Sequence, residues 1–89
     1  MGGVGQMNHL ANRLVGAQLQ RMRSEANLTQ KQVAERLGVP QSVVCKLEKG
    51  ERSMHLVEVT PYSIALGVKP DVLFARANHA LISYALAHR

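Results

Sequence analysis

The sequence lacks the residues and patterns on which most enzymes and metal sites depend. Its single cysteine, Cys45, cannot close an internal disulfide or build a cysteine-rich zinc site. Its four histidines have no metal-ligand spacing, and no glycine-rich phosphate loop occurs. No base lies close in sequence to Ser42 or Cys45 that would activate either residue as a nucleophile. We therefore expect no enzyme, no metal and no cofactor.

Long apolar runs and a secretion signal are also absent. The most apolar stretch, residues 72–87, contains Arg76 and His79 and is shorter than the roughly 20 residues that cross a bilayer. Residues 1–6 have neither the basic nor the apolar region of a signal peptide. With 89 residues the chain has room for one domain with a thin core. These features indicate a small cytoplasmic protein without a membrane partner.

Positive charge is in excess and is concentrated in one part of the chain. Eleven lysines and arginines against six acids give a net charge of +5. Eight of these basic residues, but only four of the acids, lie between residues 13 and 52. Such an excess on part of a small domain is typical of a protein with a polyanionic partner, although a merely soluble basic surface explains it equally well.

The apolar residues recur with the period of a helix, and no segment alternates as a strand does, so the sequence predicts an all-α fold. Residues 1–8 are glycine-rich and uncharged, and we expect them to form a flexible tail. Five helices are predicted, at residues 9–26 (starting at His9 or Asn12), 30–37, 41–49, 55–66 and 70–87.

Several residues predict where these helices begin and end. Asn27 tolerates the left-handed conformation that follows a helix, and Thr29 is a good N-cap for the next one. Gly38 ends the second helix with a positive φ, which only glycine adopts without cost. Pro61 predicts either a kink in the fourth helix or a restart there with Thr60 as its cap, and we expect a short or kinked helix that ends at Gly67.

The most informative stretch is residues 30–49. Two short helices that cross steeply through a tight turn need a small residue at the crossing and a residue with positive φ in the turn, and Ala34 and Gly38 meet these needs. Five apolar residues then point into the crease: Val33, Leu37, Val39, Val44 and Leu47. The outward face of the second of these helices is left for a ligand.

These residues resemble the Cro/cI-type, or lambda-repressor-like, helix-turn-helix DNA-binding domain. The resemblance covers about residues 14–74 and rests on ordered, ungapped motifs: Leu28-Thr29-Gln30, Val33-Ala34, Leu37-Gly38-Val39, Gln41-Ser42-Val43-Val44, Lys46-Leu47-Glu48 and Gly50-Glu51-Arg52. It implies a compact five-helix fold: a DNA-binding domain over residues 9–69 holds the first four helices, and the C-terminal segment, residues 70–89, forms an extended last helix for dimerisation.

The resemblance also implies roles for single residues on double-stranded DNA. The third helix enters the major groove, where Gln41, Ser42 and Lys46 would contact bases. For Gln41 and Ser42 the alternative is ordinary polarity at a helix start, and for Lys46 it is a solvated lysine or a phosphate contact. Gln30 matches the family's phosphate contact, and Lys31, Lys49 and Arg52 are candidate backbone partners by charge and placement, although each could be a plain exposed cation.

Arg23 and Glu48 are implied to form an ion pair between the first helix and the end of the third. Removing one member of such a pair strands a charge at a cost of roughly 3–5 kcal/mol. Three departures from the family pattern stand out: Pro40 replaces a Ser or Thr cap, Cys45 replaces a hydroxyl, and Met54 replaces a proline. For Cys45, redox sensing is a minor hypothesis.

The last helix predicts a protein partner. Twelve of its sixteen residues from Val72 to Ala87 are apolar, more than one small domain can cover. We expect a homodimer through Val72, Leu73, Ile82, Tyr84 and Leu86. The predicted function is that of a transcriptional regulator from a bacterium or phage, a repressor that binds a pseudo-palindromic operator. Its expected location is the cytoplasm, in association with the bacterial nucleoid. The alternative is a protein-interaction module, such as an antitoxin, that binds an unidentified protein and for which DNA is secondary.

Overall fold

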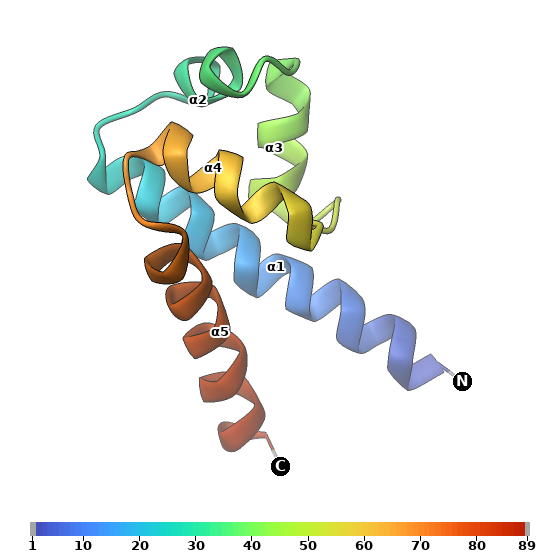
Figure 1. The fold of residues 1–89 in the computed structure, drawn as a ribbon. Coiled ribbons are helices and arrows are strands. Elements are labelled where there is room, and N and C mark those ends of the chain that lie inside the picture. Colours follow the sequence, from blue (N-terminus) through green and yellow to red (C-terminus); the bar gives the residue numbers. More distant parts are fainter. Residues whose placement is uncertain (1, 89) are drawn as a thin grey trace.

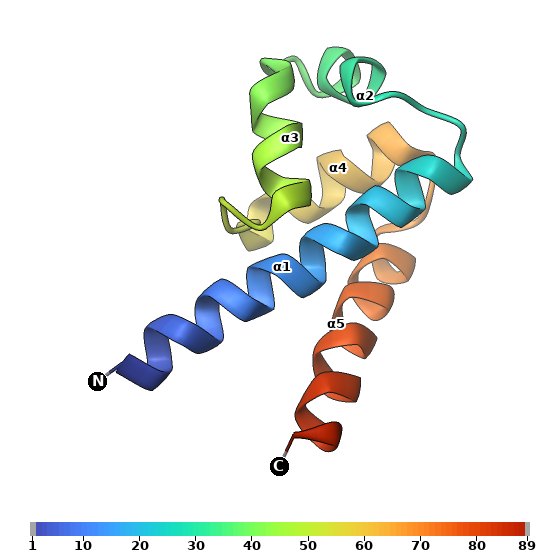
Figure 2. The same ribbon diagram turned by 180° about the vertical axis from the view of Figure 1, so that it is seen from behind.

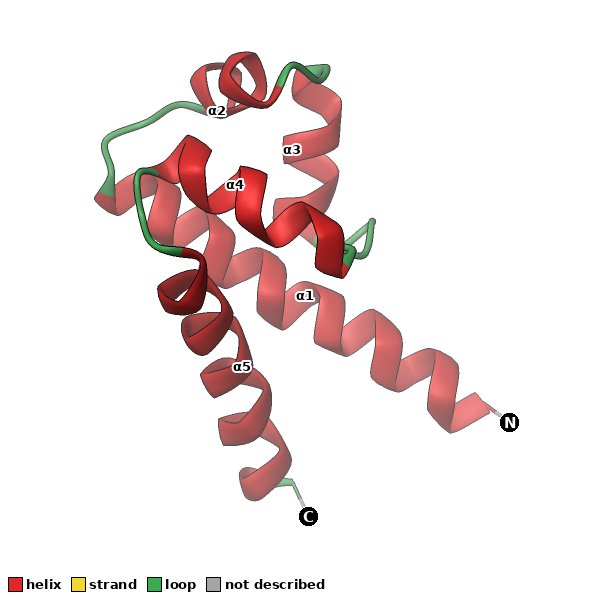
Figure 3. Cartoon of the chain, viewed as in Figure 1, coloured by secondary structure: helices red, strands yellow, loops and turns green. Residues whose placement is uncertain are grey.

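The computed structural model describes the backbone of residues 2–88 and the side chains of residues 9–88. Within this part of the chain there are five α-helices, one short 3₁₀ helix and no strand (Figure 3). The elements follow in the order α1 (Gly2–Glu25), α2 (Gln30–Leu37), α3 (Gln41–Lys49), η1 (Leu56–Glu58), α4 (Val59–Leu66) and α5 (Pro70–Ala87). The prediction of an all-α, five-helix fold is confirmed.

The first helix is longer than the sequence predicts. A flexible tail is expected over residues 1–8, but the backbone of residues 2–8 continues α1, and Met1 lies outside the described residues. Extending an existing helix avoids the cost of nucleation, although each glycine still disfavours the helix by about 1 kcal/mol relative to alanine. At the other end, Asn27 has a φ of 57°, as predicted for the residue that follows a helix.

Both ends of α2 agree with the prediction. The hydroxyl of Thr29 accepts the backbone N–H of Gln32 at 3.1 Å, and the side-chain oxygen of Gln32 accepts the backbone N–H of Thr29 at 2.8 Å. This reciprocal cap satisfies two donors that the first turn leaves unpaired. Gly38 follows the last residue with a φ of 71° and ends the helix.

The segment around Pro61 divides into two elements. η1 comes first, and α4 begins at Val59, so Pro61 is the third residue of that helix. The prediction of a short helix that ends at Gly67 is confirmed, since α4 has eight residues and Gly67 is its C-cap. Its start at Val59 differs from both predicted alternatives, a kink at Pro61 and a restart there with Thr60 as N-cap. Because the first-turn N–H groups of a helix have no intrahelical partner, the missing N–H of Pro61 costs no hydrogen bond at this position.

Two views show how the helices are arranged. α2 and α3 lie at one end of the molecule, α5 lies at the other, and α1 and α4 run between them (Figures 1 and 2). The core between these helices draws residues from all five of them: Leu19, Met22, Val33, Ala34, Val44, Leu47, Tyr62, Ala65, Leu66 and Leu73. The helix-turn-helix unit, α2 and α3, therefore packs with its inner side against the core, and its outer side faces solvent.

Candidate nucleic-acid interface

The turn between α2 and α3 has the close packing that the sequence predicts. Ala34 and Val44 are buried where the two helices meet. The N–H of Val39 donates to the carbonyl of Ala34 at 3.1 Å, which closes the turn behind Gly38. Because these contacts fix the inner side of α3, its other side is presented outward.

The outward face of α3 is polar and basic. Gln41, Ser42, Lys46 and Lys49 are exposed, and Cys45 is half-buried beside them. α3 itself lies at the margin of the molecule, at the end remote from α5 (Figure 2). An exposed helix of nine residues with amide, hydroxyl and ammonium groups on one side has the size and chemistry for a DNA major groove.

Arg23 and Glu48 join α1 to the end of α3. Arg23 Nε donates to Glu48 Oε2 at 2.6 Å, and Arg23 Nη2 donates to Oε1 at 3.0 Å. A further N–H of Arg23 donates to the carbonyl of Leu28 at 2.9 Å. The hydrogen bond with Glu48 raises the pKa of Arg23 above its ordinary value. The Glu48 side chain is only 3% exposed, so this paired charge fixes where α3 lies.

Gln30 also contacts the same carboxylate. Its side-chain N–H donates to Glu48 Oε1 at 2.9 Å, and its oxygen lies 3.5 Å from the side-chain nitrogen of Gln41. The sequence predicts a phosphate contact at Gln30, but the structure shows a half-buried side chain held within its own domain.

Arg52 is engaged by a partner that the sequence analysis missed. Two of its N–H groups donate to the Glu58 carboxylate at 3.2 and 2.7 Å. Glu58 also accepts the backbone N–H of His55 at 2.7 Å. These hydrogen bonds, chiefly that from Arg52, lower the pKa of Glu58, and the pair raises the pKa of Arg52. The available signal was the spacing of His55 and Glu58, which is that of a helix cap and its third residue.

The remaining candidate backbone partners, Lys31 and Lys49, are exposed. No ion pair involves either of them within the described residues. Of the four predicted phosphate contacts, these two therefore present an ammonium group that no carboxylate of the described residues pairs with.

A sequence comparison connects this geometry with known proteins. The model of the helix-turn-helix domain family matches residues 14–77, which is more than half of the chain. The chain belongs to this helix-turn-helix family. The match confirms the resemblance that residues 30–49 carry, and the family and fold are those of DNA-binding regulators rather than of enzymes. No curated protein matches the chain by sequence.

Solved structures share the fold over most of their length. An XRE-family like protein from Pseudomonas syringae pv. tomato strain DC3000 is 29% identical, with a TM-score of 0.73 over 89% of this chain and 96% of that one. The restriction-modification controller protein C.AhdI from Aeromonas hydrophila is also 29% identical, with a TM-score of 0.65 over 70% and 94%. The controller protein C.Esp1396I, solved as a tetramer on its natural 35 base-pair operator, is 17% identical with a TM-score of 0.71 over 81% and 95%, a likeness of fold.

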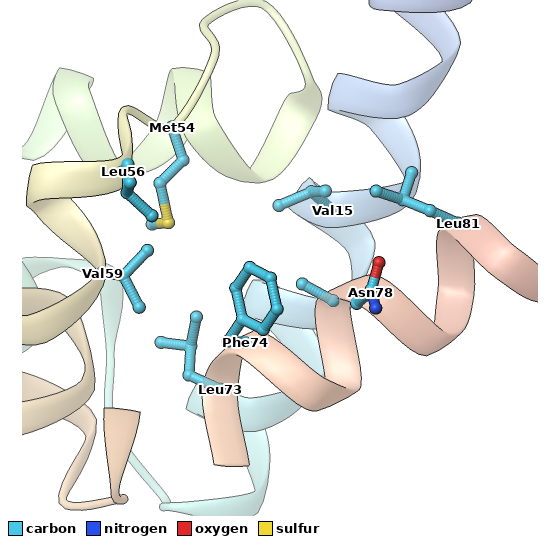
Figure 4. Close-up of a pocket in the computed structure, with 9 residues that line it drawn as sticks. Val15, Met54, Leu56, Val59, Leu73, Phe74, Asn78 and Leu81 are labelled. Carbon is cyan, nitrogen blue, oxygen red and sulfur yellow. The ribbon is translucent and has the colours of Figure 1, made fainter. Parts of the chain in front are cut away.

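The helix-turn-helix chain has a second, apolar surface on the side of α5. A cavity of about 220 Å³ opens between α1, η1, α4 and α5 (Figure 4). Apolar residues line most of it: Val15, Met54, Leu56, Val59, Leu73, Phe74, Ala77 and Leu81. Leu56 and Phe74 also extend into solvent, with 79% and 53% of their surface exposed.

The predicted dimer residues divide into two groups on this side. Val72, Ile82 and Leu86 are 41%, 48% and 59% exposed, so they are available to another chain. Tyr84 is half-buried and its ring stacks on His88 at a centroid distance of 3.9 Å. Leu73 is a correction to the prediction. It is 1% exposed because it faces the core of its own domain, on a different face of α5 from the exposed Val72, Ile82 and Leu86.

Among residues 2–88, no helix has the length and hydropathy of a membrane span. No cluster of three or more histidine, cysteine and acidic side chains with the geometry to hold a metal ion occurs in this part of the chain.

Proposed function

We propose that this protein is a sequence-specific transcriptional regulator, a repressor, that inserts α3 into the major groove of double-stranded DNA. The observation that carries the proposal is the exposed polar face of α3, held rigidly from behind by the Arg23–Glu48 pair. The family match and the operator-bound C.Esp1396I support the same function.

Three side chains would read the bases. Gln41, at the start of α3, has an amide that pairs with the N6 and N7 positions of adenine. Lys46, five residues later, favours the O6 and N7 acceptors of guanine, and Ser42 serves either base type. Each good contact of this kind contributes about 1–3 kcal/mol of discrimination against the wrong base.

Other groups would bind the DNA backbone and set the register of α3. Lys31 at the start of α2 and Lys49 at the end of α3 supply mobile positive charge, and the free N–H groups at the start of α2 favour an anion. Arg52 could contact a phosphate only by breaking its ion pair with Glu58, so we expect it to contribute less to DNA affinity than either lysine.

A homodimer would let two α3 helices read two half-sites. The exposed residues Val72, Ile82 and Leu86 of α5, with the neighbouring Phe74, supply an apolar face for a second copy. A two-fold dimer places its reading helices about 34 Å apart and requires a pseudo-palindromic operator. Bound there, on the nucleoid of the cytoplasm, it would exclude RNA polymerase from an overlapping promoter.

The first experiment is selection of bound duplexes from a random pool, followed by titration of the selected site. The affinity for the site should fall with salt at a log–log slope near −0.9 for each phosphate neutralised. Gln41→Ala should cost about 1–3 kcal/mol on the selected site and little on random DNA. Equal losses on both would reject Gln41 as a base reader, and failure to enrich any sequence would reject the proposal.

A second candidate function follows from the apolar cavity and the exposed residues around it. In an antitoxin-like module, this surface would bind a different protein and DNA binding would be secondary. Purification of the protein from its native host separates the two: a stoichiometric complex with a non-identical chain favours the module, and a homodimer favours the repressor.

A further inference from the structure

An ion pair joins the end of α1 to the second turn of α5. Arg76 Nη1 donates to Glu25 Oε1 at 2.5 Å, and Arg76 Nη2 donates to Glu25 Oε2 at 2.9 Å. The two residues are 51 positions apart in the sequence, so the pair is a contact between distant parts of the chain. Its two parallel hydrogen bonds hold the guanidinium and the carboxylate in one plane, which restricts how the two helices turn against each other.

The position of Glu25 is unfavourable for α1 alone. Glu25 is the last residue of this helix, where the helix dipole favours a cation over an acid. Arg21 lies one turn earlier on α1 and is exposed, but the carboxylate of Glu25 forms its ion pair with Arg76. The hydrogen bond from Arg76 lowers the pKa of Glu25, so the carboxylate is ionised at neutral pH. An acid at this position therefore stabilises the contact between α1 and α5 and not α1 itself.

The opposite flank of α5 faces a cavity. Phe74 and Arg76 are separated by about 200° around the axis, since a helix has about 3.6 residues per turn. Phe74 lines the apolar cavity of about 220 Å³ (Figure 4). Leu73, which is 1% exposed, anchors the start of α5 in the core between these two flanks. Because the cavity leaves room on one flank, the ion pair on the other flank opposes a turn of α5 about this anchor.

The angle of α5 matters because α5 and α3 lie at opposite ends of the molecule (Figures 1 and 2). In the proposed homodimer, the exposed face of α5 joins the two copies and each α3 reads one half-site. The molecule is 38 Å long. Over a lever of about 20 Å, a turn of about 10° moves α3 by about 3.4 Å, which is roughly the rise of a single base pair. A small change in this angle therefore changes which spacing of half-sites fits the dimer.

We propose that Arg76 and Glu25 are positioning residues that set the angle between α5 and the helix-turn-helix, and thereby the spacing of half-sites that the dimer accepts. Both act through the placement of α3 and not through a contact of their own with DNA. This inference rests on the proposed function, because it requires a dimer that binds two half-sites.

The direct tests are Glu25→Gln and Arg76→Gln, which each remove one charge and leave a polar side chain. Because exposed ion pairs contribute little to stability, both variants should stay folded. Dissociation constants are measured on the selected operator, on operators with one base pair added or removed between the half-sites, and on a single half-site. We expect the preference for the selected spacing to fall by about three- to fivefold, the scale of one well-formed exposed pair. Affinity for the single half-site should stay within about twofold, because the contacts of α3 are unchanged.

Two further variants serve as controls for this measurement. Arg21→Gln removes an exposed cation one turn from Glu25 and should keep the spacing preference. Glu25→Arg and Arg76→Glu should each lose the preference when made alone. Combined in one protein they should restore it, because the pair forms again with its charges exchanged. A double variant no more selective than either single one would overturn the proposal.

The mass of each variant separates the angle of α5 from the formation of the dimer. Sedimentation velocity at the concentration of the binding measurements should give the mass of two chains for Glu25→Gln and for Arg76→Gln. If either variant dissociates into single chains, its loss of spacing preference is a loss of the dimer, and the proposal is overturned.

Failure of the underlying function is distinguishable from failure of the ion pair. If the unmodified protein sediments as one chain, or binds all spacings equally, both the dimer on two half-sites and the positioning roles are overturned. If it prefers one spacing and Glu25→Gln and Arg76→Gln keep that preference, only the positioning roles are overturned. The same holds if the two variants lose affinity equally on all four duplexes, since that result assigns the pair a structural role alone.

Discussion

A Cβ atom on Gly16 would lie 2.5 Å from the backbone carbonyl oxygen of Glu48 and would also meet that of Leu47. α1 and α3 therefore touch backbone to backbone at the end of the reading helix. The Arg23–Glu48 pair ties the same two helices together with side chains. Gly16 and this pair hold the position of α3, on which the proposed recognition of a DNA groove depends.

Gly16→Ala tests this close contact. Alanine favours a helix by about 1 kcal/mol over glycine, but here its methyl group meets backbone atoms that no side-chain rotation can move. We expect a net loss of about 1–3 kcal/mol in the free energy of unfolding, measured by urea denaturation. Gln20→Ala, on the exposed side of the same helix, should stay within about 0.5 kcal/mol. A more stable Gly16→Ala protein would mean that α3 moves aside freely.

The Arg52–Glu58 pair predicts a dependence of stability on pH. Because the folded-state pKa of Glu58 lies below its unfolded value, its contribution is fully present above the unfolded pKa of about 4.3. It is lost as the pH falls from there through the folded pKa. Urea midpoints of the native protein and of Glu58→Gln should therefore differ at pH 6 and converge in acid. A constant difference across that range would show that the charge of Glu58 is not involved.

The hydroxyl of Tyr62 is buried and has no hydrogen-bond partner among the described residues. Burial raises the pKa of Tyr62, so the group stays protonated. An unpaired buried hydroxyl costs free energy, so Tyr62→Phe should raise the free energy of unfolding by about 1 kcal/mol. Ser63→Ala is the matched control, because its hydroxyl donates to the carbonyl of Thr60 at 2.7 Å and its loss should be destabilising. A destabilised Tyr62→Phe would indicate that a water molecule pairs with this hydroxyl.

The elements that the sequence predicts correctly have local causes. The bounds of α2 follow from Thr29 at its start and Gly38 at its end. The start of α5 follows from Pro70. The start of α1 is not predictable from composition, because the glycine-rich residues there disfavour a helix and carry no N-cap signal.

The differences in the site arise from contacts between distant residues. Whether Arg52 meets a phosphate or Glu58 depends on how the loop after α3 folds back, and no spacing rule determines that. The periodicity of α5 shows that two of its faces are apolar, but it does not say which face the domain covers. The sequence therefore predicts Leu73 at the dimer interface, whereas the structure buries it in the core of its own domain.

The assignment of the outward face of α5 to a dimer is tested by Ile82→Glu. A carboxylate there would be buried against the second copy without a partner, so we expect the dimer to dissociate while each chain stays folded. Sedimentation velocity at micromolar concentration should change from the mass of two chains to that of one. Gln20→Glu adds the same charge at an exposed position of α1, away from the outward face of α5, and should leave the mass unchanged. Leu73→Ala should instead lower the free energy of unfolding by about 2–5 kcal/mol, because it opens a cavity in the core. If the native protein sediments as one chain at this concentration, the proposed dimer is rejected, and with it the proposal of a pseudo-palindromic operator.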